Sequence, residues 1–110
     1  MSTHADRAFN IEEERQQLVD ELAAEQGPNW SEGYKPGSFG CHELLDRTSL
    51  LADTVERFVL SHPSCALNRD WYELAERAAA ALRELYQRIG TEHMEAGKPA
   101  SDCAQQEINP

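Results

Sequence analysis

The sequence has little of what marks several large classes of protein. Its three cysteines are an odd number without short-range pairing, which suits a reducing compartment better than a disulfide framework. No uncharged apolar run approaches the roughly 20 residues of a membrane-spanning helix. The first residues also lack the basic and apolar regions of a signal peptide. We therefore expect a cytoplasmic protein that does not enter a membrane.

Basic residues are also scarce. Ten Lys and Arg stand against 20 Asp and Glu, which gives a formal net charge of −10 at pH 7. A nucleic-acid-binding surface is built from clustered Lys and Arg, so we expect no direct binding to nucleic acid. The acidic excess instead favours a protein partner with a basic surface.

The remaining composition is that of a globular protein. Hydrophobic residues make up 40% of the chain and charged residues 27%, which is enough apolar material to bury a core. A length of 110 residues suits one domain. We expect a single helical domain over residues 1–96 and a flexible C-terminal tail over residues 97–110.

Hydrophobic periodicity predicts three helices and no strands. The helices run near residues 11–26, 41–61 and 69–89. Asn10, with Glu13 three residues later, has the pattern of a helix N-cap, and Gly27 that of a helix end. Asn68 is the expected N-cap of the third helix. This helix ends at Gly90 or continues for another turn and a half, and the sequence does not decide between the two.

The second and third helices have broad apolar faces, which we expect to form the core. The face of the second helix consists of Leu44, Leu45, Thr48, Leu51, Ala52, Val55, Phe58 and Val59. The face of the third helix consists of Trp71, Leu74, Ala75, Ala78, Leu82, Leu85, Tyr86 and Ile89. The short link at residues 62–68 directs these two helices into an antiparallel hairpin.

The first helix has only a thin apolar seam. Ile11, Leu18 and Leu22 fall within a narrow arc, and Arg15 interrupts it. Such a helix is not stable alone and must pack against a larger apolar surface. The predicted fold class is therefore all-α, a small three-helix bundle built on the hairpin. A homodimer in which two hairpins complete a four-helix bundle is the alternative.

Residues 27–40 contain four of the six glycines and two of the five prolines, so we expect no regular element there. The same segment contains Trp30, Tyr34 and Phe39. Large rings are typical of an ordered loop that covers a core or contacts a partner.

The charges are distributed unevenly. In the second and third helices most Arg residues follow an acidic residue by four positions, which neutralises the helix surface. The pairs are Glu43–Arg47, Asp53–Arg57, Glu73–Arg77 and Glu84–Arg88. Through residue 27, seven acidic residues stand against two arginines, a net charge of −5. At helical spacing Glu14, Glu21 and Glu25 line one edge of the seam, where they either bind a basic partner or only keep the protein soluble.

Cysteine and histidine offer two candidate chemistries. Cys41, His42, His62 and Cys65 are the residue types of a structural zinc site. Positions 42 and 62 bracket the second helix, however, and a rise of ~1.5 Å per residue separates them by about 30 Å. We therefore expect no metal site within one chain. The hairpin also brings Cys41 near His93, in the arrangement of a nucleophilic thiolate and the base that activates it. A thiol on a core face is, however, more often an inert apolar group.

His42 and Asp46 share one face of the second helix, but acidic residues in a first turn are expected from the helix dipole alone.

We interpret the protein as a small, acidic, non-catalytic module that binds a basic partner surface, as a regulator or inhibitor, and that needs no cofactor. The expected partner-binding residues are Glu14, Glu21, Glu25, Trp30, Tyr34 and Phe39. Two alternatives stay open. The carboxylates of the module can mimic nucleic acid and inhibit a nucleic-acid-binding protein, or the protein is a metal- or thiol-dependent enzyme that uses Cys41, His42 and His93.

Overall fold

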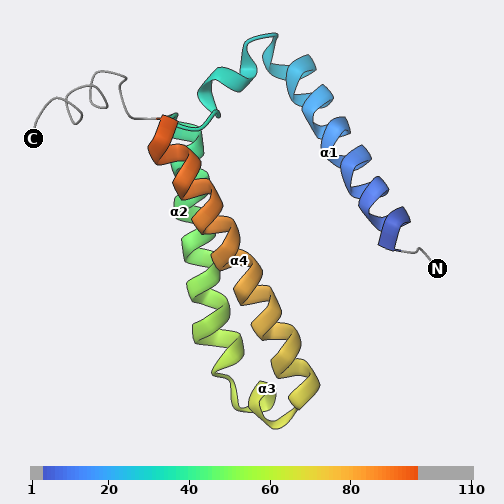
Figure 1. The fold of residues 1–110 in the computed structure, drawn as a ribbon, viewed down its shortest axis with the longest axis vertical. Coiled ribbons are helices and arrows are strands. Elements are labelled where there is room, and N and C mark those ends of the chain that lie inside the picture. Colours follow the sequence, from blue (N-terminus) through green and yellow to red (C-terminus); the bar gives the residue numbers. More distant parts are fainter. Residues whose placement is uncertain (1–3, 97–110) are drawn as a thin grey trace, which may run out of the picture. The chain divides into compact units, whose positions relative to one another are not determined.

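The computed structural model describes residues 4–96, and all of the regular structure within that range is helical (Figure 1). The chain divides into two compact units, Met1–Glu32 and Gly33–Pro110. The predicted all-α class is confirmed for the described residues. The predicted tail, residues 97–110, lies outside them.

The first unit contains the helix α1 (His4–Gln26). The predicted start at the Asn10 cap is wrong, because the helix begins six residues earlier in a segment without Gly or Pro. The predicted end at Gly27 is confirmed. Gly27 has a φ of +95°, which glycine adopts at little cost, and its N–H donates to the carbonyl of Ala23 at 2.9 Å. The short 3₁₀ helix η1 (Trp30–Gly33) follows.

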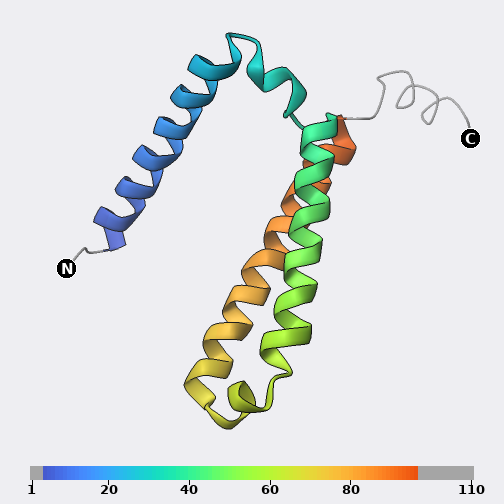
Figure 2. The same ribbon diagram turned by 180° about the vertical axis from the view of Figure 1, so that it is seen from behind.

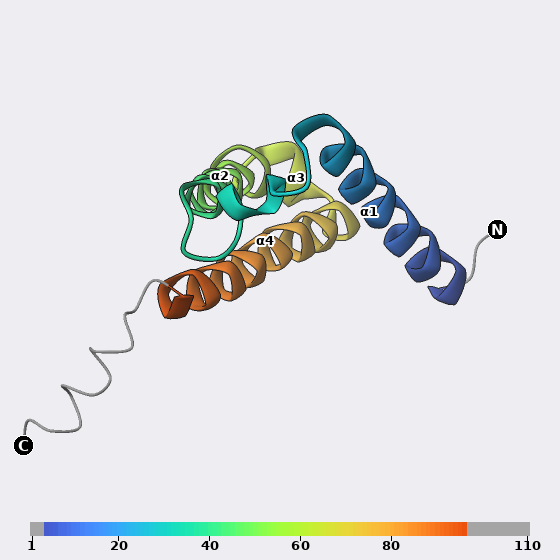
Figure 3. The same ribbon diagram turned by 90° about the horizontal axis from the view of Figure 1, so that it is seen from above.

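The second unit is an antiparallel helical hairpin. Its elements are α2 (Phe39–Thr54), the π-helical continuation η2 (Val55–Leu60), the short helix α3 (Pro63–Leu67) and α4 (Arg69–Ala96). The helix formed by α2 and η2 packs along α4 (Figure 1 and Figure 2), and α2 and α4 are again neighbours when seen from above (Figure 3). The predicted hairpin is confirmed.

Side-chain caps explain where the helices of the hairpin begin. The Ser38 hydroxyl accepts a hydrogen bond from the Cys41 N–H at 3.2 Å, so α2 begins two residues before the predicted start at residue 41. The predicted Asn68 cap is confirmed, since its side-chain oxygen accepts from the Trp71 N–H at 3.1 Å. The predicted link contains α3, with Pro63 in its first turn, and His62 Nδ1 accepts from the Ser64 N–H at 3.0 Å.

The last helix continues through Gly90 to Ala96. A Cβ at position 90 would lie 3.7 Å from a methyl carbon of Leu45, which is ordinary packing distance. Gly90 therefore faces the contact with α2, and this packing offsets the low helix propensity of glycine.

The centre of the hairpin is built from small residues. Among the described residues the buried ones are Cys41, Thr48, Ala52, Cys65 and Ala79. Ala79 is completely buried, and no large side chain in the described range is. The Thr48 hydroxyl donates to the Leu44 carbonyl at 2.8 Å, which satisfies its polar group inside the contact.

The outer parts of both predicted core faces are exposed, which corrects the expectation that each whole face is core. These exposed residues are Leu44, Leu51, Phe58, Val59, Trp71, Leu74, Leu85 and Tyr86. The physical reason is geometric, because two helices bury only the narrow strip along which they touch, and covering a wider face needs another layer.

Candidate protein-interaction site

The predicted acidic edge of α1 is exposed. Glu14, Glu21 and Glu25 all face solvent. Gln17 Nε2 donates to Glu21 Oε1 at 3.4 Å, a long contact from a neutral group. Among the side chains that the structure describes, Glu14 and Glu25 make no hydrogen bond or ion pair. The charge of this edge is therefore largely unneutralised.

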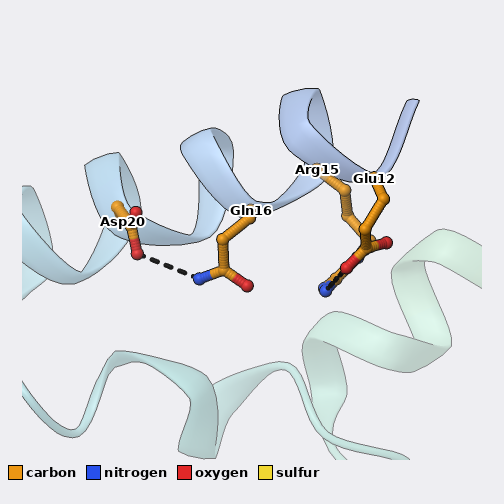
Figure 4. Close-up of polar contacts among 4 residues, drawn as sticks. All are labelled: Glu12, Arg15, Gln16 and Asp20. Atoms are coloured by element: carbon orange, nitrogen blue, oxygen red, sulfur yellow. Dashed lines mark hydrogen bonds and ion pairs between the residues drawn. The ribbon is translucent and has the colours of Figure 1, made fainter. Parts of the chain in front are cut away.

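Arg15, which interrupts the apolar seam of α1, is neutralised locally. Its Nε and Nη2 donate to the two carboxylate oxygens of Glu12 at 2.8 and 2.5 Å, as Figure 4 shows. These hydrogen bonds lower the pKa of Glu12 below its ordinary value of 4.5 and raise the pKa of Arg15. Gln16 donates to Asp20 at 3.0 Å in the next turn (Figure 4).

The apolar seam of α1 is also open to solvent. Ile11 is 50% exposed and Leu18 is 55% exposed, and at 100° per residue Leu18 lies directly beside the acidic edge. One side of α1 thus presents carboxylates that attract a basic surface next to apolar groups that such a surface can cover.

The three predicted aromatic anchors differ in environment. Trp30 is half-buried and belongs to the first unit, whereas Tyr34 and Phe39 are exposed and belong to the second. Phe39, at the start of α2, is 82% exposed. The Tyr34 ring lies against the backbone of Gly40, which fixes the ring at the entry to α2.

The candidate enzyme residues gather at the open end of the hairpin in a different arrangement from the expected one. The rings of His42 and His93 are 5.7 Å apart at 38°, and His93 Nδ1 accepts from the Gly37 N–H at 2.8 Å. His42 Nε2 lies 3.5 Å from Asp46 Oδ2. Cys41 is buried, and within residues 4–96 its thiol has no hydrogen bond to an imidazole.

The four candidate zinc ligands are divided between the two ends of the second helix. Cys41 and His42 lie in the first turn of α2, and His62 and Cys65 lie after η2 and in α3. Within the described part of the chain, no three His, Cys, Asp or Glu residues are placed to hold a metal ion together.

The hairpin carries an exposed apolar face, which the sequence analysis assigned to the core and left to be covered by a second copy only in the homodimer alternative. We define the apolar face as the residues Leu44, Leu51 and Phe58 of α2 and η2 and Trp71, Leu74, Ala78, Leu82, Leu85 and Ile89 of α4. In an antiparallel pair, the helical register places both stripes on the same side of the buried contact. A hollow of about 320 Å³ lined by Phe58, Cys65 and Trp71 among others joins the stripes at the closed end.

The opposite side of the hairpin is polar. Ser49 and Gln87 line a second hollow there, together with Arg83. Arg83 donates to Glu56 of η2 and, at 2.8 Å, to Glu76 of α4. Glu56 contributes most to raising the pKa of Arg83. Glu56 and Arg83 are 27 residues apart in the sequence, so no local pattern predicted this ion pair.

The i,i+4 ion pairs were easier to predict. Glu43–Arg47, Asp53–Arg57 and Glu84–Arg88 are confirmed, at 3.1 to 3.5 Å. The fourth pair is corrected, since Glu73 pairs with Arg69 at 3.2 Å rather than with Arg77.

No protein-family model, curated protein or solved structure matches this chain.

Among the described residues, no helix combines the length and the apolar character needed to cross a membrane.

Proposed function

We propose that this protein is a small, acidic, non-catalytic module that binds a partner protein through a basic surface of the partner and regulates or inhibits it. One observation carries the proposal. On α1, three exposed carboxylates lie beside the exposed Ile11 and Leu18.

The two kinds of group have different roles in this proposal. Glu14, Glu21 and Glu25 speed the encounter with a basic surface because opposite charges steer association. Leu18 slows dissociation because its apolar area leaves water on binding, and Trp30 of the same unit is a further anchor. Tyr34 and Phe39, which belong to the second unit, stay predicted anchors. We treat the nucleic-acid mimic as the special case in which the basic surface is a phosphate-binding groove.

The experiment starts with the partner. Proteins retained from a lysate of the native cell are identified by mass spectrometry, and the purified partner is used for association kinetics. The variant Glu14→Gln/Glu21→Gln/Glu25→Gln should associate roughly 3- to 10-fold more slowly at low salt and with a flatter salt dependence. Its melting temperature should be nearly unchanged, since all three side chains are exposed.

A matched control removes the same charge elsewhere. Glu13→Gln/Asp20→Asn/Glu92→Gln also neutralises three exposed carboxylates, two of them on the other side of α1. If the control slows association as much as the test variant, only net charge matters. If the test variant binds as fast as wild type at low salt, the edge only keeps the protein soluble.

The finer parts of the sequence-based fold stay predictions. They are a single domain over residues 1–96, a three-helix bundle closed by the first helix or completed by dimerisation, and a cytoplasmic location. The enzyme alternative stays a prediction as well.

A further inference from the structure

We propose that the apolar face of the hairpin binds the apolar face of a second copy of this chain, so that two hairpins form a four-helix bundle. This goes beyond the proposed function, because it concerns a different surface and a different partner.

The large apolar side chains of the hairpin lie outside its buried centre. Trp71 is 59% exposed and Phe58 is 68% exposed, while the buried residues of the hairpin are small. A two-helix layer cannot cover its own face, and stable helical domains pack at least two layers around a core. A second hairpin supplies the missing layer.

The apolar face is about as large as one side of a standard protein interface. From their exposed fractions, the six large exposed side chains of the apolar face present roughly 700 Å², close to the ~800 Å² that each partner contributes to a standard interface. These side chains are those of Leu44, Leu51, Phe58, Trp71, Leu74 and Leu85. The half-buried Leu82 and Ile89 contribute further apolar area to this face.

The charge distribution favours a second copy of the chain over a basic partner at this face. The apolar face contains no charged residue, and the nearest charges on α2, Glu43 and Arg47, neutralise each other at 3.5 Å. Residues 39–96, which form the hairpin, carry ten acidic and six basic side chains, a net charge of −4 spread over 58 residues, so the repulsion between two hairpins is modest. A basic partner gains nothing from this face, whereas the residues through 27 carry a net charge of −5.

The apolar face consists of two stripes on neighbouring helices, a shape that suits a second copy. The stripe on α2 and η2 spans about 21 Å and that on α4 about 27 Å at the helical rise. In an isologous dimer the same face of both copies forms the contact. Both stripes of one hairpin can therefore be covered by the two stripes of the other. The apolar seam of α1 is a single row about 17 Å long, and Arg15 interrupts it. A helix with such a seam has enough apolar area to cover one of the two stripes of the apolar face, but not both.

The test is the mass of the full chain in solution. Sedimentation velocity of wild type from micromolar to near-millimolar concentration should show a dimer, and its melting temperature should rise with concentration. Leu51→Asp, which places a charge in the middle of the apolar face, should weaken the dimer by roughly 100-fold or more. Ser49→Asp is the matched control on the polar side of the same helix and should leave the dimer intact.

Circular dichroism shows whether Leu51→Asp still folds. If it loses helix, the milder Leu51→Ala/Leu85→Ala should keep the helix and still weaken the dimer by about 10-fold or more. A wild type that stays monomeric with a concentration-independent melting temperature overturns the proposal, and so does equal weakening by Ser49→Asp. Neither result affects the α1 proposal, because that is tested by different variants and by association with another protein.

Discussion

Gly40 is the residue at which close packing leaves least room. A Cβ at this position would collide with the Gly33 carbonyl oxygen and would lie 2.5 Å from Cδ1 of the Tyr34 ring. The backbone oxygen cannot move aside as a flexible side chain can. Glycine is therefore required here by the close approach of the loop to the start of α2 rather than by an unusual φ.

Gly40→Ala should lower the free energy of unfolding by about 1–3 kcal/mol, the usual range for overpacking. Urea denaturation followed by circular dichroism measures it. Gly33→Ala is the control, because a Cβ there meets no atom within 4 Å, and its effect should stay within ~0.5 kcal/mol. Equal effects of the two substitutions would contradict the packing of this loop.

Glu12 provides a test of the Arg15 contact through its pKa. The hydrogen bonds from Arg15 lower the pKa of Glu12 in the folded state, so the pair stabilises α1 above the ordinary pKa of 4.5. The contribution is lost as the pH falls through the lowered value. A carboxyl-carbon NMR titration should give Glu12 a pKa below 4.5, and Arg15→Gln should return it toward 4.5. An unchanged titration in the variant would mean that the contact does not persist in solution.

At the scale of elements, Ala79 sets how closely α4 approaches α2. It is completely buried, so its methyl group leaves no space for a larger side chain. The neighbouring Ala80 lies on the same helix and is exposed. Substituting Leu at each position separates the effect of packing from that of helix propensity, because Ala and Leu have similar helix propensities.

Ala79→Leu should lower the free energy of unfolding by about 1–3 kcal/mol, whereas Ala80→Leu should change it by less than ~0.5 kcal/mol. Urea denaturation of both variants and of wild type at one protein concentration measures these changes in the free energy of unfolding. If Ala79→Leu were neutral, the line of contact between α2 and α4 would be misplaced.

At the scale of the whole molecule, charge and apolar area are separated between the two units. The residues through 27 hold half of the net charge, while the hairpin, residues 39–96, has a net charge of −4 over more than twice the length and carries the larger apolar face. The two proposals follow this division, with a basic partner for α1 and a second copy for the hairpin. Long-range steering and apolar association can then act on different surfaces of one small chain.

The sequence by itself determined the local features of this protein. Helical periodicity, the caps at Gly27 and Asn68 and three i,i+4 ion pairs depend on residues within one or two turns, and all were predicted. The errors at helix starts are also local, since helix formers before Asn10 and the Ser38 cap extended the helices.

Only the tertiary structure decided which part of each apolar face is covered. Periodicity identifies an apolar face but not its partner, and two helices cover only the strip near Thr48 and Ala79. The contacts between His42 and His93 and between Glu56 and Arg83 also join residues far apart in sequence. Such pairs depend on how the helices are placed in the hairpin, which no local pattern of residues encodes.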